Sequence, residues 1–177
     1  MALPDSLKVA SGSQTSVTWK ASSGDYAITL ASIAAAAARQ GVKGDLGENY
    51  DRLWFAQLTI NMDVAPTAGD EIELFLGFSP NATAGTDNPA ALVGTDSAYT
   101  GSSGGSVANT KFQATYIGSL PLTPDADTIV QKVVLGPFTP PFRYVCPLLV
   151  NAADQALEGD DDSHQIVLYS LPEQIHD

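Results

Sequence analysis

The sequence is poor in charged side chains, and basic residues are especially scarce. Charged residues make up 16% of the 177 positions, whereas about 25% is usual in a soluble domain. Only 8 of them are basic and 20 are acidic, which gives a formal net charge of −12. An acidic chain lacks the basic surface that holds nucleic-acid phosphates or anionic lipids. We therefore expect no nucleic acid and no membrane among its partners.

Cysteine and histidine are nearly absent. The single cysteine, Cys146, excludes an intramolecular disulfide, and its apolar neighbours in FRYVCPLLV predict a buried, inert thiol. One cysteine and two histidines cannot supply a zinc-binding set. The sequence has no P-loop and no GxGxxG fingerprint, so we expect no cofactor.

Long apolar runs are also missing. No stretch of 18 apolar residues occurs, and this excludes a hydrophobic membrane-spanning helix. The first eight residues, MALPDSLK, lack the basic region and apolar run of a signal peptide. We therefore expect synthesis and folding in a cytoplasm.

What the sequence does contain is a series of short alternating segments separated by Gly, Pro, Asn and Asp. Such a series predicts an all-β chain, specifically an antiparallel β-sandwich of jelly-roll type. The expected strands lie within residues 15–21, 25–32, 52–65, 70–79, 111–122, 127–138, 142–151 and 164–171.

The length fits one domain, residues 1–177, with two long connections. Residues 79–110 are rich in Gly, Ser, Thr and Ala, and such a long loop without structure is typical of functional or partner-ordered segments. We expect it to be mobile in the free chain. Residues 152–164 form an acidic loop, and no Lys or Arg follows Arg143.

Five consecutive alanines stand out in ITLASIAAAAARQGVKGDLG, residues 28–47. Ser32 could cap a short helix from Ile33 to Gln40 that Gly41 ends, and the alanine run favours this interpretation. The alternative is an extended edge strand from Arg39 to Leu46. In both cases the small side chains permit another backbone to approach closely.

Candidate catalytic and metal-binding residues are few. Gly101, Ser103 and Gly105 spell GxSxG, but the Gly/Ser-rich flanks are typical of a flexible loop rather than a nucleophile elbow. A triad of Ser103, His164 and a nearby aspartate has nothing to position it, so we expect no enzyme. Three consecutive acids do not match a calcium loop and are weak metal candidates at best. They are Asp160, Asp161 and Asp162.

Exposed aromatic residues could bind sugars. The candidate aromatic residues are Trp19, Trp54, Tyr99 and Tyr116. The two tryptophans lie in alternating segments, which predicts core packing. Tyr99 alone falls in an expected loop, and one tyrosine does not make a sugar platform.

Several segments together resemble a family of small structural proteins of tailed bacteriophages. They are the ITLAS, AARQG and DLG segments of residues 28–47, followed by APTAG, IELFLGFSP and TAGTDNP, and later by FRYVCPLLVN and HQIVLYSLPEQI. The resemblance spans approximately residues 26–175 and implies a β-sandwich located in the virion. It carries over no catalytic residue.

The resemblance implies a structural protein of the virion. Among such proteins we expect a head decoration (cement) protein that covers joints between capsid subunits, with a neck, tail or carbohydrate-binding receptor protein as the alternative. The expected partners are the major capsid protein or other virion proteins and further copies of the chain, with a trimer as the expected oligomer. The alanine stretch then becomes the expected assembly surface, with Arg39 and Lys43 as polar anchors. The full set of expected interface residues is Ala35, Ala37, Arg39, Gln40, Lys43 and Tyr99.

Overall fold

The computed structural model describes residues 15–48, 50–103, 105–124 and 129–171. Three parts of the sequence discussed above lie outside these ranges. They are the N-terminal MALPDSLK, His176 and the last residues of the HQIVLYSLPEQI segment. Gly104 inside the GxSxG pattern also lies outside these ranges.

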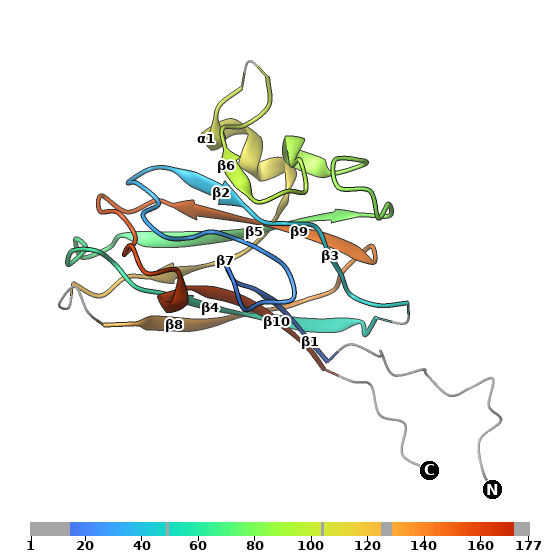
Figure 1. Ribbon diagram of the computed structural model, residues 1–177, viewed down its shortest axis with the longest axis horizontal. Helices are drawn as coiled ribbons and strands as arrows, with labels where there is room; N and C mark the ends of the chain where they lie inside the picture. Colours follow the sequence, from blue (N-terminus) through green and yellow to red (C-terminus); the bar gives the residue numbers. More distant parts are fainter. Residues whose placement is uncertain (1–14, 49, 104, 125–128, 172–177) are drawn as a thin grey trace, which may run out of the picture.

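The chain is a sandwich of two antiparallel sheets, as the sequence predicts (Figure 1). The first sheet has the strand order β1-β10-β4-β8. Its strands are β1 (Ser16–Trp19), β4 (Leu53–Ile60), β8 (Gln131–Phe138) and β10 (Gln165–Leu171). The jelly-roll part of the prediction stays a prediction.

The second sheet has the order β6-β2-β9-β5-β7, and the short strand β3 also pairs with β9. Its strands are β2 (Ala38–Gln40), β3 (Gly44–Asp45), β5 (Glu71–Ser79), β6 (Ser97–Tyr99), β7 (Thr115–Pro121) and β9 (Tyr144–Asn151). The central pair, β5 and β9, runs in register from Ile72 opposite Asn151 to Ser79 opposite Tyr144.

The main core fills the space between the two sheets. Alternation places Trp54, Leu58 and Ile60 of β4 on the inner face, where they are fully buried. Trp19 is also fully buried, and its indole N–H donates to the Val42 carbonyl at 2.7 Å, so that its polar atom is satisfied. Both tryptophans are therefore core residues, as the alternating pattern predicts.

A third layer covers the outer face of the second sheet, built from residues 80–103 and 105–114. We call this layer the cap (Figure 1). It includes η2 (Pro89–Ala91), strand β6, α1 (Val107–Thr110) and η3 (Lys111–Gln113). A second apolar cluster forms beneath it, where Phe75, Leu148 and Cys146 from the sheet meet Leu92 and Tyr99 from the cap. The expectation of a loop without structure at 79–110 is therefore wrong for the described residues.

The expected helix near residues 32–40 is also wrong. A turn takes its place, in which the Ala37 N–H donates to the Ala34 carbonyl at 3.1 Å and Ala36 has a φ of 59°. Strand β2 follows at once and lies between β6 and β9, with Ala38 opposite Val150. The physical reason is that two neighbouring strands satisfy the backbone of residues 38–40, which outweighs the helix preference of alanine. The alternative of one extended edge strand from Arg39 to Leu46 is right only in part: β2 ends at Gln40, β3 covers Gly44–Asp45, and residues 41–43 belong to neither strand. It is wrong in placing β2 at an edge.

The expected strand at 25–32 reduces to an isolated bridge between Tyr26 and Trp19. Within the described ranges, no helix has the length and apolarity needed to cross a bilayer.

Candidate functional site

Arg39, an expected interface anchor, is used inside the chain. Its Nε donates to Asp96 at 2.7 Å, and Asp96 also accepts the Thr29 hydroxyl at 2.5 Å and the Thr29 N–H at 3.1 Å. Burial raises the pKa of the Asp96 carboxyl, but the hydrogen bonds from Arg39 and Thr29 outweigh burial and hold the pKa below its ordinary 3.8. The pair therefore fastens the cap, through Asp96, to strand β2 and to the segment around Thr29.

Lys43, the second expected anchor, is buried. Its ammonium lies within hydrogen-bond distance of the Ser79 hydroxyl, at 3.2 Å, and of three cap carbonyls. These are the carbonyls of Asn81 at 2.9 Å, Thr83 at 2.7 Å and Thr86 at 2.9 Å. Burial lowers the pKa of Lys43. Cys146 and Asp87 lie nearby and raise this pKa, so they offset part of the lowering. A lysine is rarely buried without partners, and here it closes the loop that leaves β5.

Gln40 and Tyr99 also serve the cap. The Gln40 side-chain oxygen accepts the Val93 N–H at 2.7 Å, and the Tyr99 hydroxyl donates to the Ala90 carbonyl at 2.7 Å. Both side chains are buried. Four of the six expected interface residues thus bind the chain's own cap and are engaged within the subunit.

The two alanines of the expected interface differ in position. Ala35 is exposed at the turn, whereas Ala37 is half-buried and packs against the main core. Of the six expected interface residues, Ala35 is the one that the structure places fully on the surface.

The three consecutive acids of the acidic loop point to separate partners. Asp160 accepts the Asp162 N–H at 2.9 Å and begins η4 (Asp161–Ser163), while Asp161 accepts the Ala31 N–H at 2.9 Å. Asp162 pairs with Lys20 at 3.2 Å. Within the described ranges, no three His, Cys, Asp or Glu side chains form a group that could hold a metal.

His164 is a buried link between main-chain segments. Its Nδ1 accepts the Asn61 N–H at 3.2 Å, so Nε2 carries the proton and donates to the Glu158 carbonyl at 3.0 Å. Burial lowers the pKa of His164. Both ring nitrogens are therefore occupied and neither can serve Ser103, which is exposed in the cap between β6 and α1.

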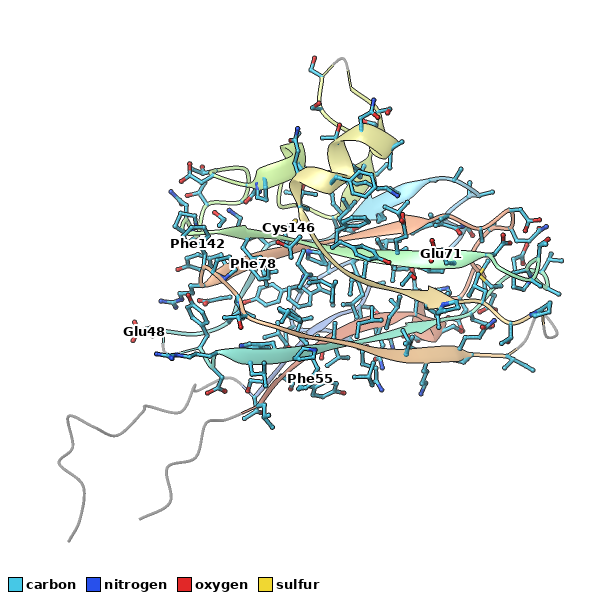
Figure 2. All side chains as sticks on the ribbon, turned by 180° about the vertical axis from the view of Figure 1, so that it is seen from behind. Glu48, Phe55, Glu71, Phe78, Phe142 and Cys146 are labelled. Carbon is cyan, nitrogen blue, oxygen red and sulfur yellow. The ribbon has the colours of Figure 1, made fainter. Side chains whose placement is uncertain are left out.

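A further surface, which the sequence patterns above did not predict, is the outer face of the first sheet, which no described segment covers. Cross-strand pairs bring apolar residues together there: Tyr169 lies opposite Phe55, Leu171 opposite Leu53, and Gln57 lies between Val167 and Val134. Val134 is 62% exposed, Leu171 51% and Tyr169 42%. We call this surface the open face, and Figure 2 shows Phe55 on the side of the first sheet turned away from the core.

A signal for the open face was present in the sequence. Leu53, Trp54 and Phe55 are consecutive, as are Val133 and Val134, and adjacent strand residues point to opposite faces. Apolar neighbours in a strand therefore indicate that both faces of the sheet are apolar.

A second exposed apolar surface lies on the cap side. Phe112, which is 68% exposed, and Tyr116, which is 50% exposed, both contact the buried Phe75 ring, with centroid distances of 5.9 and 5.1 Å. Lys111 lies 5.1 Å from the Phe112 ring centroid and forms an ion pair with Glu73. We call Phe112 and Tyr116 the aromatic pair. Of the four aromatic residues considered for sugar binding, only Tyr116 is exposed.

The two apolar surfaces lie on opposite sides of the molecule. The aromatic pair contacts Phe75, which belongs to the cluster beneath the cap, whereas the open face backs the main core. Figure 1 shows the cap above the second sheet and the first sheet, with strands β4, β8 and β10, below the second sheet. The described residues form no pocket between the open face and the aromatic pair or elsewhere.

No protein-family model matches the chain, and no curated protein matches it either.

Proposed function

We propose that the chain is a structural protein of a tailed-bacteriophage virion, and specifically a decoration protein that strengthens the head. The observation that carries the proposal is the pair of opposed apolar surfaces, the open face and the aromatic pair. A protein that joins neighbours needs two separate contact surfaces, and exposed apolar patches are typical of such contacts. The phage-like segments of the sequence supply the class of assembly.

The mechanism is mass action. A protein that binds the assembled shell, and does not bind dissociated subunits, stabilises the shell by its binding free energy. Each contact surface can be small, because many identical copies act on one particle. This role requires no catalytic residue and no cofactor.

The experiment that tests the position on the virion is a copy-number measurement. Quantitative mass spectrometry of purified particles should find the chain in proportion to the major capsid protein. A dozen copies or fewer would overturn the decoration role and place the protein in the neck, the tail or a vertex fibre.

A receptor-binding role is the second candidate, and the exposed Tyr116 beside Phe112 favours it, since aromatic rings can stack on sugars. A glycan array with the purified chain, and a calcium titration of the acidic loop, test this role. Binding that disappears in Tyr116→Ala would support it, and no binding in either assay would remove it.

A further inference from the structure

We propose that two copies of the chain associate through their open faces, sheet against sheet. The inference goes beyond the proposed function, because it concerns the free protein and would hold whatever assembly the protein joins. It rests on the exposure of the open face and on the charges found there.

The open face is nearly uncharged, in contrast to the formal net charge of −12 of the whole chain. Its outward positions, of which Thr59 and Val167 are buried and the others half-buried or exposed, are Ser16, Thr18, Leu53, Phe55, Gln57, Thr59, Lys132, Val134, Gln165, Val167, Tyr169 and Leu171. None of these is a carboxylate, and the single charged one is the basic Lys132, although the chain carries 20 acidic residues. Two copies with a net charge of −12 each can approach through this face with the least repulsion.

The same charges argue against other occupants of the face. A basic partner would need carboxylates on the open face, and the open face has none. An acidic partner would need several basic residues there, and the open face has only one lysine. A nearly neutral, apolar face is instead complementary to itself, as a two-fold contact requires.

The geometry is compatible with such a contact. Twisted sheets pack face to face about 10 Å apart, with interdigitating side chains. Val134, Tyr169 and Leu171 are the exposed large side chains that would fill this space. The Tyr169 hydroxyl already lies 3.4 Å from the Gln57 side-chain oxygen, so its polar end keeps a partner when the ring is buried.

Sedimentation equilibrium of the full-length chain, over about 1–100 μM, tests the proposal. The wild-type chain should be a dimer at the upper end of this range. Val134→Glu and Tyr169→Glu each place a like charge on both faces of the contact, and each should weaken association at least about tenfold. The matched control is Val64→Glu, which changes an exposed valine of the β4–β5 connection and should leave the dimer intact.

Thermal melting separates a lost contact from a lost fold, since the three variants should melt within a few degrees of the wild type. A wild-type monomer at every concentration, an oligomer other than a dimer, or a dimer that both open-face variants leave unchanged would overturn the proposal. A monomer that is nevertheless abundant in virions would overturn this inference alone. A dimer absent from virions would overturn the proposed function alone.

Discussion

His164 shows how one buried side chain makes the stability of the chain depend on pH. Burial holds the pKa of His164 in the folded chain below the ordinary 6.5. As the pH falls below 6.5, the unfolded chain takes up a proton that the folded chain does not, so the free energy of unfolding falls. The loss continues until the pH reaches the lowered pKa of the folded state. Asp45 and Asp96 have pKa values below 3.8, and their stabilisation is lost only at more acidic pH.

Denaturant unfolding between pH 7 and pH 5 measures this effect. The free energy of unfolding should fall by up to about 1.4 kcal/mol per pH unit in part of this range. His164→Asn should be less stable at pH 7 by about 1–3 kcal/mol, because the Glu158 carbonyl keeps the Ser32 N–H but loses its second donor, in a buried site. The variant should also lack the additional pH dependence of the wild type. An equal pH dependence in both proteins would contradict the assignment of the proton to His164.

Lys43 is the second residue whose role can be isolated. Lys43→Met keeps an unbranched stem but removes the donor that Ser79 and the three cap carbonyls share. We expect a loss of about 1–3 kcal/mol in the free energy of unfolding, because buried oxygens remain without a donor. Arg52→Met, at an exposed basic residue that is not an outward position of the open face, is the control and should change stability by no more than about 0.5 kcal/mol.

Limited proteolysis distinguishes loosening of the cap from a general loss of stability. In the wild-type free chain the described part of the cap should resist cleavage, contrary to the mobility expected from its composition, because it covers the apolar cluster around Phe75. Lys43→Met should be cleaved first within residues 80–103. Cleavage there at the same rate in both proteins would show that Lys43 does not hold the cap.

At the scale of elements, most strands could be predicted and the local conformation of the alanine stretch could not. Strands β4, β5 and β9 follow alternating or continuous apolar runs, which report burial directly. The alanines carry only a local helix preference, whereas Ala38 pairs with Val150, more than 100 positions later in the chain. A single sequence contains no signal for that pairing.

The candidate site, likewise, could be predicted only in part from the sequence. Sequence patterns indicated small and polar residues as anchors, but they could not indicate that Gln40, Lys43 and Tyr99 hold a cap made by the chain itself. The open face was predictable in part from consecutive apolar residues. Its lack of carboxylates became visible only when the pairing of β1, β10, β4 and β8 placed their outward residues together.

The alanine turn gives a prediction that compares two neighbouring positions. Ala35→Leu changes an exposed side chain and should leave the melting temperature nearly unchanged, whereas Ala37→Leu overfills a site against the core and should cost about 1–3 kcal/mol. Incorporation into particles is then measured with Ala35→Leu. Unchanged melting with lost incorporation would make the turn an assembly surface, and full incorporation would remove the turn from the proposed contacts.

At the scale of the whole molecule, the three layers explain why two contact surfaces remain. The cap covers most of the outer face of the second sheet and leaves Phe112 and Tyr116 exposed at its border. Among the described residues no such layer covers the first sheet, and Val134, Tyr169 and Leu171 are exposed on its outer face. A molecule built in this way can hold a second copy on one side and the shell on the other.

The central claim, that the protein strengthens a phage head, is tested most directly by the thermal stability of particles that lack it. The temperature of genome release is measured with no added protein, with the wild-type chain and with the double variant Phe112→Ser, Tyr116→Ser. We expect the wild-type chain to raise this temperature in a saturable manner and the double variant, although folded, to leave it unchanged. If saturating wild-type protein leaves the release temperature unchanged, the protein does not strengthen the head.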